Sequence, residues 1–302
     1  VRRVRAAGMS DERSERRIGL IQLHLAVLLA GGSGLFAKAL AVGPDVLTAG
    51  RTVFGAASLL AFATLAGRRL VVRPARDAVG LLLCGFVLAA HWVTFFLAIQ
   101  VSTVAVGLLA FSTFPLFTTL LEPAVFGERL RPTDVVLAAI VSLGLVLVVP
   151  SFDAGDGMVR GAFWGVVSAL LFAALALASR SYNARQPALA IAFHQQLGAA
   201  LITVPFALPS VASVSPGDWA GLVVLGVVFT AVGQGLAVAS LRHLRARTVS
   251  VVFGLEPVYA IVLARLILHE SPSPRTLLGG LLICGAAAGA CLRREAPLES
   301  QR

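Results

Sequence analysis

Residues 111–132 read FSTFPLFTTLLEPAVFGERLRP, and residues 253–274 read FGLEPVYAIVLARLILHESPSP. Both stretches follow one skeleton: a Phe, three residues, a Pro, twelve residues, a Glu, three residues and a second Pro. The shared positions, at a constant offset of 142 residues, are Phe111 and Phe253, Pro115 and Pro257, Glu128 and Glu270, and Pro132 and Pro274. A chain that repeats so long an apolar pattern is built from two related halves.

The composition indicates that these stretches lie in a membrane. Hydrophobic residues make up 58% of the 302 residues, charged residues make up 13%, and the mean hydropathy is +0.88. A soluble domain averages roughly 25% charged residues. Apolar runs of ~20 residues, the length that crosses a hydrocarbon core of ~30 Å, recur along the chain. The runs do not alternate in polarity as barrel strands would. The expected fold class is therefore an all-α polytopic membrane protein.

The sequence predicts ten transmembrane helices, because Pro, Gly, Asp and Arg interrupt the apolar runs. The expected spans are residues 18–41, 44–66, 77–100, 102–126, 133–150, 159–180, 186–208, 217–240, 247–268 and 275–292. They divide the chain into a basic tail (1–17), a first five-helix repeat (18–150), a second five-helix repeat (159–292) and a C-terminal tail (293–302).

The basic residues predict how these spans are oriented. With the N-terminus in the cytoplasm, the inside segments carry 20 Lys and Arg residues, and the outside loops carry only Arg160 and Arg275. Cytoplasmic loops are the ones that accumulate Lys and Arg. Both termini are therefore expected on the cytoplasmic side of a bacterial inner membrane. The net charge of +10 follows from this bias and does not require a nucleic-acid partner.

The repeat unit of five spans is odd, so the second copy is expected to cross the membrane upside down. The loops agree with this. QVST (100–103), before span four, has no basic residue, whereas its counterpart LRHLRART (241–248) has three. Two halves with opposite charge bias are typical of inverted-repeat transporters.

The ten spans, the inverted halves and the ending GERLRP, together with GGSGLFAKAL (31–40), resemble the EamA-type drug/metabolite transporter superfamily. The resemblance extends from Ile18 to Leu292, and HESPSP (269–274) departs from the more usual Gly-Glu there. It implies a basket of ten helices around a central cavity, walled mainly by spans one, three, four, six, eight and nine. Within the superfamily, the chain is most similar to bacterial amino-acid and metabolite exporters.

The resemblance, read with the residue chemistry, yields a set of candidate substrate contacts on the wall helices. Glu256 lies mid-span, where an ionisable side chain is costly and faces either a cavity or a partner. His91 and Trp92 stand one turn before Phe95, so they present a polar and aromatic surface that either contacts substrate or packs. Trp164 is either an interfacial residue or a wall residue. The full set is His91, Trp92, Phe95, Phe111, Trp164, Gln234, Glu256 and Tyr259.

Pro115 and Pro257 each lie about halfway through a span. Proline removes a helix hydrogen bond and clashes with the carbonyl four residues back, so it kinks a helix. We expect the pair to act as symmetry-related hinges, although membrane helices also tolerate Pro without such a role.

Several further polar residues keep two interpretations each. Arg51 binds a substrate carboxylate or pairs with a neighbouring span. Glu128 and Glu270 cap a helix through its dipole or form a gating ion pair. Lys38, which the offset maps to Arg180, serves as a terminal anchor. His194, Gln195 and Gln196 join helices by hydrogen bonds or relay protons.

The expected function is a secondary or facilitated transporter that exports small metabolites, most of all aromatic or other neutral amino acids, by alternating access. The alternatives are a membrane-embedded enzyme, an exporter of another metabolite or of a drug, and a channel. The chain has no nucleotide-binding motif, and Cys84, Cys284 and Cys291 lack metal-ligand spacing. We therefore expect no enzymatic activity, cofactor or metal, and a monomer whose partners are the lipid bilayer and its small-molecule substrate.

Overall fold

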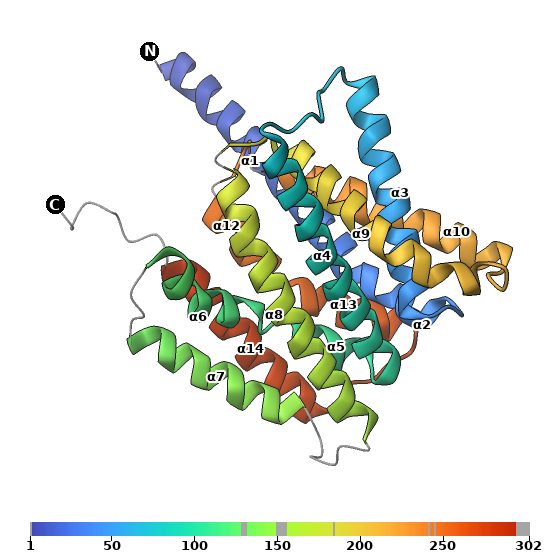
Figure 1. The fold of residues 1–302 in the computed structure, drawn as a ribbon. Helices are drawn as coiled ribbons and strands as arrows, with labels where there is room; N and C mark the ends of the chain where they lie inside the picture. The colour runs from blue at the N-terminus through green and yellow to red at the C-terminus, as the bar shows by residue number, and fades with distance from the viewer. Residues whose placement is uncertain are drawn as a thin grey trace.

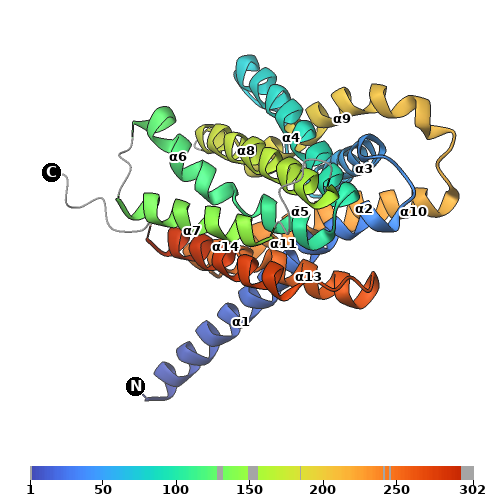
Figure 2. The same cartoon turned by 90° about the horizontal axis from the view of Figure 1, so that it is seen from below.

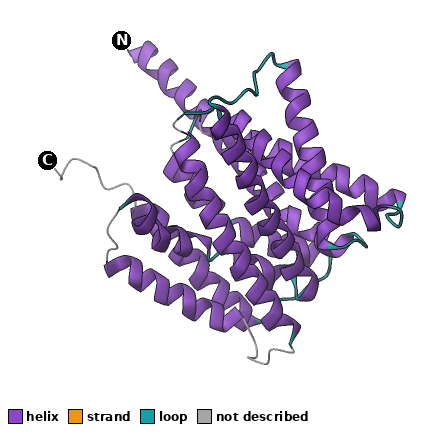
Figure 3. Ribbon diagram, in the orientation of Figure 1, coloured by secondary structure: helices purple, strands orange, loops and turns teal. Residues whose placement is uncertain are grey.

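The computed structural model describes residues 2–127, 132–148, 156–183, 185–240, 242–244 and 246–293. Glu128 lies outside these residues. The described part of the chain consists of helices and loops, and Figure 3 shows no strand in it. The expected all-helical class is confirmed.

The helices follow the expected spans in chain order. In the first half they are α1 (Arg2–Gly32), a 3-10 turn η1 (Ser33–Leu35) and α2 (Phe36–Ala39), then α3 (Pro44–Leu65), α4 (Ala75–Val101), α5 (Val104–Phe111), α6 (Phe114–Phe126) and α7 (Pro132–Val148). In the second half they are α8 (Gly157–Asn183), α9 (Ala188–Val211), α10 (Pro216–Val224), a π-helical segment η2 (Leu225–Val232), α11 (Gly233–Ser240), α12 (Ala246–Phe253), α13 (Glu256–Ile267) and α14 (Pro274–Arg293).

The lengths of these helices fit a membrane. Among the described residues, 7 helical segments are long and apolar enough to cross a bilayer, and two shorter apolar helices lie in α7 and α14. The protein is therefore a polytopic membrane protein, as its composition predicts.

The repeated Phe-x-x-x-Pro skeleton encodes a break in the middle of two spans. Helix α5 ends at Phe111, and α12 ends at Phe253. Each of these residues lies four positions before a proline, which is the position whose carbonyl a proline ring displaces. Pro115 and Pro257 then occupy the first turn of α6 and α13, where proline is well tolerated. The spans are thus two half-helices joined at residues 112–113 and 254–255.

The helices pack in neighbouring pairs (Figures 1 and 2). Helix α4 runs beside α8 and α9, α3 packs along α9, and α7 lies against α14. The backbones of α7 and α14 approach so closely that a Cβ added to Gly144 would lie only 2.8 Å from the Gly279 carbonyl oxygen. Such close backbone approach is the usual basis of helix association in lipid.

The largest buried side chains gather at the centre of the bundle. Phe95 and Phe96 of α4 are 1% and 0% exposed, and Phe111 and Leu108 of α5 pack into the same core. This core joins residues of both halves, since Ala169 of α8 and Ala260 of α13 also belong to it. Helix α5 therefore ends, and helix α13 begins, beside a common aromatic centre.

Candidate functional site

The most unusual group at the centre is the guanidinium of Arg51. Helix α3 carries it into the bundle, where the residue is only 4% exposed, and its Cζ lies 3.4 Å from the centroid of the Trp92 ring. This cation–π stack is worth about 2 kcal/mol when desolvated. Within the described residues, Arg51 Nε and Nη1 have no hydrogen-bond partner, and neither has Trp92 Nε1. Three buried N–H groups thus lack an acceptor.

His91 stands beside Trp92 and is anchored from one side. Its Nδ1 lies 2.8 Å from Ser168 Oγ and 3.1 Å from the Ser168 carbonyl oxygen on α8. Its other ring nitrogen, Nε2, is buried without a partner in the part of the chain that the structure describes. The His91 and Trp92 rings are 4.6 Å apart between centroids. Ser168 was not among the predicted residues.

The aromatic candidates of the first half come together around His91. The centroid of the His91 ring lies 6.1 Å from that of Phe95 and 5.2 Å from that of Phe111. Phe172 of α8 lies 5.0 Å from His91 and completes the group. His91, Trp92, Phe95 and Phe111 therefore pack together as one largely buried aromatic group.

Glu256 reaches the same region from the second half. It is the first residue of α13, directly after the break in the ninth span, and it is only partly buried. It interacts electrostatically with Arg51. The ion pairs of the described residues do not include one between them within 4.0 Å. Helix α1 packs directly against this turn. A Cβ added to Gly31 of α1 would lie only 2.7 Å from the Glu256 carbonyl oxygen.

Two further polar groups lie close to this region. Tyr259, one turn after Glu256, has its hydroxyl 2.7 Å from His24 Nδ1 of α1. Gln196 of α9 is 1% exposed, and its side-chain oxygen has no partner among the described residues. That side chain lies against Gly55, one turn after Arg51, where the buried Thr230 of η2 also packs. The π-helical geometry of η2 is itself typical of functional positions.

Gln196 also divides the polar run of α9. His194 bonds the Ala190 carbonyl of its own helix, and Gln195 donates to Ser179 Oγ of α8. Gln195 therefore joins two helices, as predicted for the run, whereas Gln196 turns toward the central residues.

Among the described residues, hydrogen bonds and ring contacts join none of Trp164, Gln234 and Tyr259 to this group. The ring contacts of Trp164 in the described residues are with the neighbouring, exposed Phe163. Gln234 of α11 is exposed. We use the name central cluster for Arg51, His91, Trp92, Gln196 and Glu256, the residues with polar groups in this region.

The two halves are in contact at the end of the bundle where the first span finishes. We call this end the Lys38 end. Glu270, in the loop after α13, accepts the Val104 N–H at 3.0 Å to Oε2 and 3.3 Å to Oε1. Val104 is the first residue of α5. Lys38 donates a hydrogen bond to the Ser102 carbonyl oxygen at 2.8 Å. Its positive charge also stabilises the negative charge of Glu270. Glu270 is therefore a helix cap, but of a helix in the other half.

His269 directs the chain toward this contact. Its φ of 56° lies in the left-handed region, which non-glycine residues rarely adopt. The turn lets the Glu270 N–H bond the Ala264 carbonyl at 3.2 Å. Burial raises the pKa of Glu270 above its ordinary value, against the opposing effects of the Val104 N–H and the Lys38 charge.

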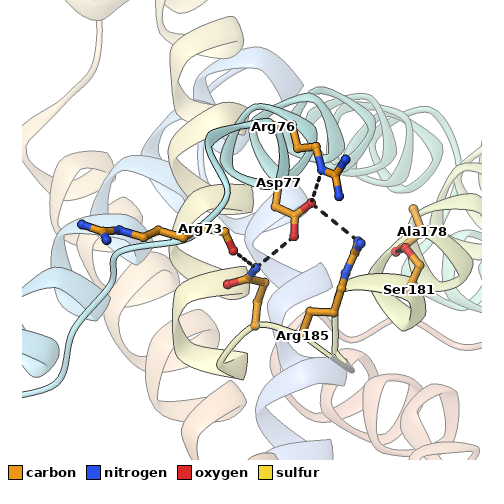
Figure 4. A network of polar contacts seen from close by, with 7 residues as sticks. Arg73, Arg76, Asp77, Ala178, Ser181 and Arg185 are labelled. Atoms are coloured by element: carbon orange, nitrogen blue, oxygen red, sulfur yellow. Dashed lines mark hydrogen bonds and ion pairs between the residues drawn. The ribbon is translucent and has the colours of Figure 1, made fainter.

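The opposite end, the Asp77 end, is held by a polar network (Figure 4). Asp77 of α4 is 4% exposed and accepts a hydrogen bond from Gln186 Nε2 at 2.9 Å. Arg185 Nη2 lies 3.6 Å from the same carboxylate. Nearby, Arg180 donates to Glu122 at 3.0 Å. Both contacts join one half of the chain to the other.

The described residues contain no group of three or more His, Cys, Asp or Glu side chains placed to hold a metal ion. The polar groups of the central cluster are instead the N–H donors of Arg51 and Trp92, a ring nitrogen of His91, the amide of Gln196 and the carboxylate of Glu256. Such a set can bind a small charged molecule by hydrogen bonds and ion pairs.

Comparison with known proteins gives this arrangement a context. The profile of the EamA-like transporter family matches residues 17–149 and again residues 159–291. The uncharacterized transporter YxxF of Bacillus subtilis is 28% identical over 224 residues, which cover 73% of this chain and 72% of YxxF. An uncharacterized transporter of Archaeoglobus fulgidus is 26% identical and covers 88% of this chain and 94% of its own length.

Two other similarities bear on this chain. The pseudopaline exporter CntI of Pseudomonas aeruginosa is 28% identical over 208 residues, covering 67% of this chain and 71% of CntI. One solved crystal structure matches 93% of this chain and 97% of its own with a TM-score of 0.64, at 24% identity, and shows the fold alone.

Proposed function

The chain belongs to the EamA-like transporter family, which its two halves each match, and from this premise we propose that it exports small metabolites, most of all amino acids. The observation that carries the proposal is the buried Arg51, which stacks on Trp92 and shares with it three N–H groups that have no acceptor among the described residues. A substrate held between Arg51 and Glu256 would touch both halves at once.

The cost of the cluster supports a binding role. A charged side chain in the middle of a membrane protein is expensive and marks a substrate or ion pathway. A buried N–H left without an acceptor costs about 1–3 kcal/mol, and the cluster leaves three such groups on Arg51 and Trp92. A packing role would be served by apolar side chains at lower cost. A ligand that supplies the missing acceptors explains why the cost is retained.

The transport step would be alternating access. The breaks at residues 112–113 and 254–255 divide two spans beside the cluster, so the halves of each span can tilt separately. Pro115 and Pro257 are the proposed hinges. A substrate that binds both Arg51 and Glu256 couples its own release to the relative movement of the two repeats.

The proposed orientation in the membrane is the one that the basic residues favour. Both termini would lie in the cytoplasm of a bacterial cell and the Lys38 end would face outward. The contacts of Glu270 at that end and of Asp77 at the other would then separate in turn. The proposed working unit is a monomer in the inner membrane.

A second candidate function is the export of a metabolite other than an amino acid. The observation that favours it is the similarity to CntI, which is named as an exporter of pseudopaline.

The test is counterflow in proteoliposomes with a panel of radiolabelled amino acids. We expect saturable uptake of at least one amino acid into vesicles preloaded with the same compound, and none into empty vesicles. The absence of counterflow for every amino acid would refute the amino-acid proposal. Counterflow with another metabolite would support the second candidate.

A further inference from the structure

The orphaned donors of the central cluster belong to two stacked side chains. Arg51 Nε and Nη1 and Trp92 Nε1 belong to two side chains stacked 3.4 Å apart, from the Arg51 Cζ to the Trp92 ring centroid, and within the described residues none of the three nitrogens has an acceptor. The Arg51 side chain is fixed by this stack and by burial. A ligand that satisfies these nitrogens must therefore offer more than one hydrogen-bond acceptor.

The backbone that carries Arg51 is also fixed. A Cβ on Gly226 of η2 would lie 3.1 Å from the Arg51 carbonyl oxygen, and a Cβ on Gly50 would lie 2.8 Å from Leu222. The backbone of α3 at Gly50 and Arg51 therefore packs closely against α10 and η2. The guanidinium cannot follow a ligand by moving its helix, so the ligand has to match its position.

The planar fork of a guanidinium matches the two oxygens of a carboxylate. The local charge balance selects further. Arg51 can carry one positive charge and Glu256 one negative charge, and the ion pairs of the described residues do not join them within 4.0 Å. A dianionic phosphate would add two charges beside Glu256. A molecule with one carboxylate and one ammonium group leaves the balance unchanged and satisfies both partners.

We infer that Arg51 and Trp92 form a carboxylate subsite, and Glu256 an ammonium subsite, of a binding site for small zwitterions. The inference rests on the proposed function and narrows its substrates. Compounds that carry only a cationic group, or no charge at all, leave Arg51 without an acceptor and are excluded. Simple organic anions leave Glu256 without a cation and bind weakly.

The inference is tested by binding, separately from transport. The purified full chain in detergent is heated with each of the twenty L-amino acids, and the rise in Tm with concentration gives the affinity. Every amino acid that binds is then tested as its methyl ester, which lacks the carboxylate charge, and as its N-acetyl derivative, which lacks the ammonium charge. We expect both derivatives to bind about tenfold more weakly or worse, because each loses a charge-assisted bond.

Two variants locate the subsite within the protein. Arg51→Met removes the guanidinium, and we expect it to bind the amino acid and its methyl ester equally weakly. Trp92→Phe keeps a ring under Arg51 and removes only the indole N–H, so it should weaken the amino acid severalfold and leave the ester unchanged. The matched controls are Trp219→Phe and Arg265→Met, at the exposed residues of α10 and α13, which should bind as the parent does.

The outcomes separate this inference from the proposed function. If no amino acid binds, or if methyl esters bind as tightly as the acids, the subsites are wrong. If Arg51→Met is unstable, Trp92→Phe decides alone, and unchanged affinity in that variant refutes the carboxylate subsite. If the protein binds amino acids more tightly than their derivatives but shows no counterflow, the export proposal is refuted and the two subsites stand. Counterflow of esters at the rate of the acids would refute the subsites and leave export.

Discussion

Replacing Glu270 with Ala should loosen the contact between the two repeats at the Lys38 end. The carboxylate accepts the Val104 N–H with both oxygens, at 3.0 and 3.3 Å, and it lies at the first residue of α5. Glu270→Ala removes this acceptor. Glu270→Gln removes the charge but keeps one oxygen that can accept the same N–H. The two variants therefore separate the hydrogen bond from the charge.

The expected magnitude follows from the geometry. A hydrogen bond to a charged group contributes about 1.5–3 kcal/mol when buried. Because Glu270 is only half-buried, we take the lower end, about 1.5 kcal/mol. A difference of ~1.4 kcal/mol changes an equilibrium tenfold. Glu270→Ala should therefore raise the ratio of separated to closed molecules at the Lys38 end about tenfold, whereas Glu270→Gln, which keeps an acceptor without the buried charge, should not raise it.

The assay uses a single cysteine behind the contact. Val106 is 3% exposed and lies within the first turn of α5, so a Val106→Cys reporter should react with an impermeant maleimide only when the contact separates. The reporter is placed in a chain whose native cysteines are replaced by Ala. Asp45→Asn, at another acid of the Lys38 end, is the control. Equal labelling of Glu270→Ala and the parent would refute the reasoning.

The pH dependence has a definite sign. Burial raises the pKa of Glu270 in the closed contact, so the closed state binds the proton more strongly than a state in which Glu270 meets water. Between the two pKa values, acid therefore favours the closed state. Labelling of the reporter should slow as the pH falls through this window. Glu270→Gln should abolish the dependence, and a parent whose labelling speeds up in acid would contradict the assignment.

Three other predictions follow from the proposed function. Glu256→Gln should keep the folded yield and lower counterflow about tenfold, the loss of one charge-assisted bond, with an altered pH dependence; a loss of yield with normal specific activity would assign Glu256 to structure. Pro115→Ala and Pro257→Ala should fold as well as the parent, slow flux, and shift cysteine accessibility in opposite directions, so parental flux and accessibility would end the hinge proposal. A reporter fused after residue 302 should signal from the cytoplasm and one inserted at residues 153–156 from the outside, and matching locations would overturn the orientation.

The sequence predicts well those features that depend on local chemistry. Apolar length determines which segments become helices, and the repeated prolines determine where two of them break. Phe111 and Phe253 end their helices four residues before a proline, whereas Pro123 and Pro205 lie inside continuous helices. The two family matches likewise follow the duplication that the offset of 142 residues reveals.

The site is harder to predict, because it depends on which helix faces meet. Trp164 and Gln234 were chosen for their depth and residue type, but the ring contact of Trp164 in the described residues is with Phe163, and Gln234 is exposed. Their helices are apolar on most faces, so no amphipathic pattern indicates the inward side. Arg51 had two possible partners in sequence terms, and only the fold places it on Trp92. Ser168 and Gln196 carry no local signal for their central contacts.

The partner of Glu270 was beyond sequence reasoning for a similar reason. A carboxylate before Pro274 suggests a cap for the helix that follows. The left-handed turn at His269 directs the carboxylate to α5 instead. A cap was predicted correctly in kind, but the capped helix belongs to the other repeat.

The cap that Glu270 places on α5 also orders events during synthesis. The two residues are 166 positions apart, so at about 5–20 residues per second the ribosome needs roughly ten to thirty seconds to supply the cap after α5 has emerged. Until then the Val104 N–H must be hydrated at the membrane surface, because lipid offers it no acceptor. The first half thus enters the membrane with one helix start incomplete. A nascent chain that stops before the ninth span would lack Glu270, so its Val104 N–H would stay without this acceptor.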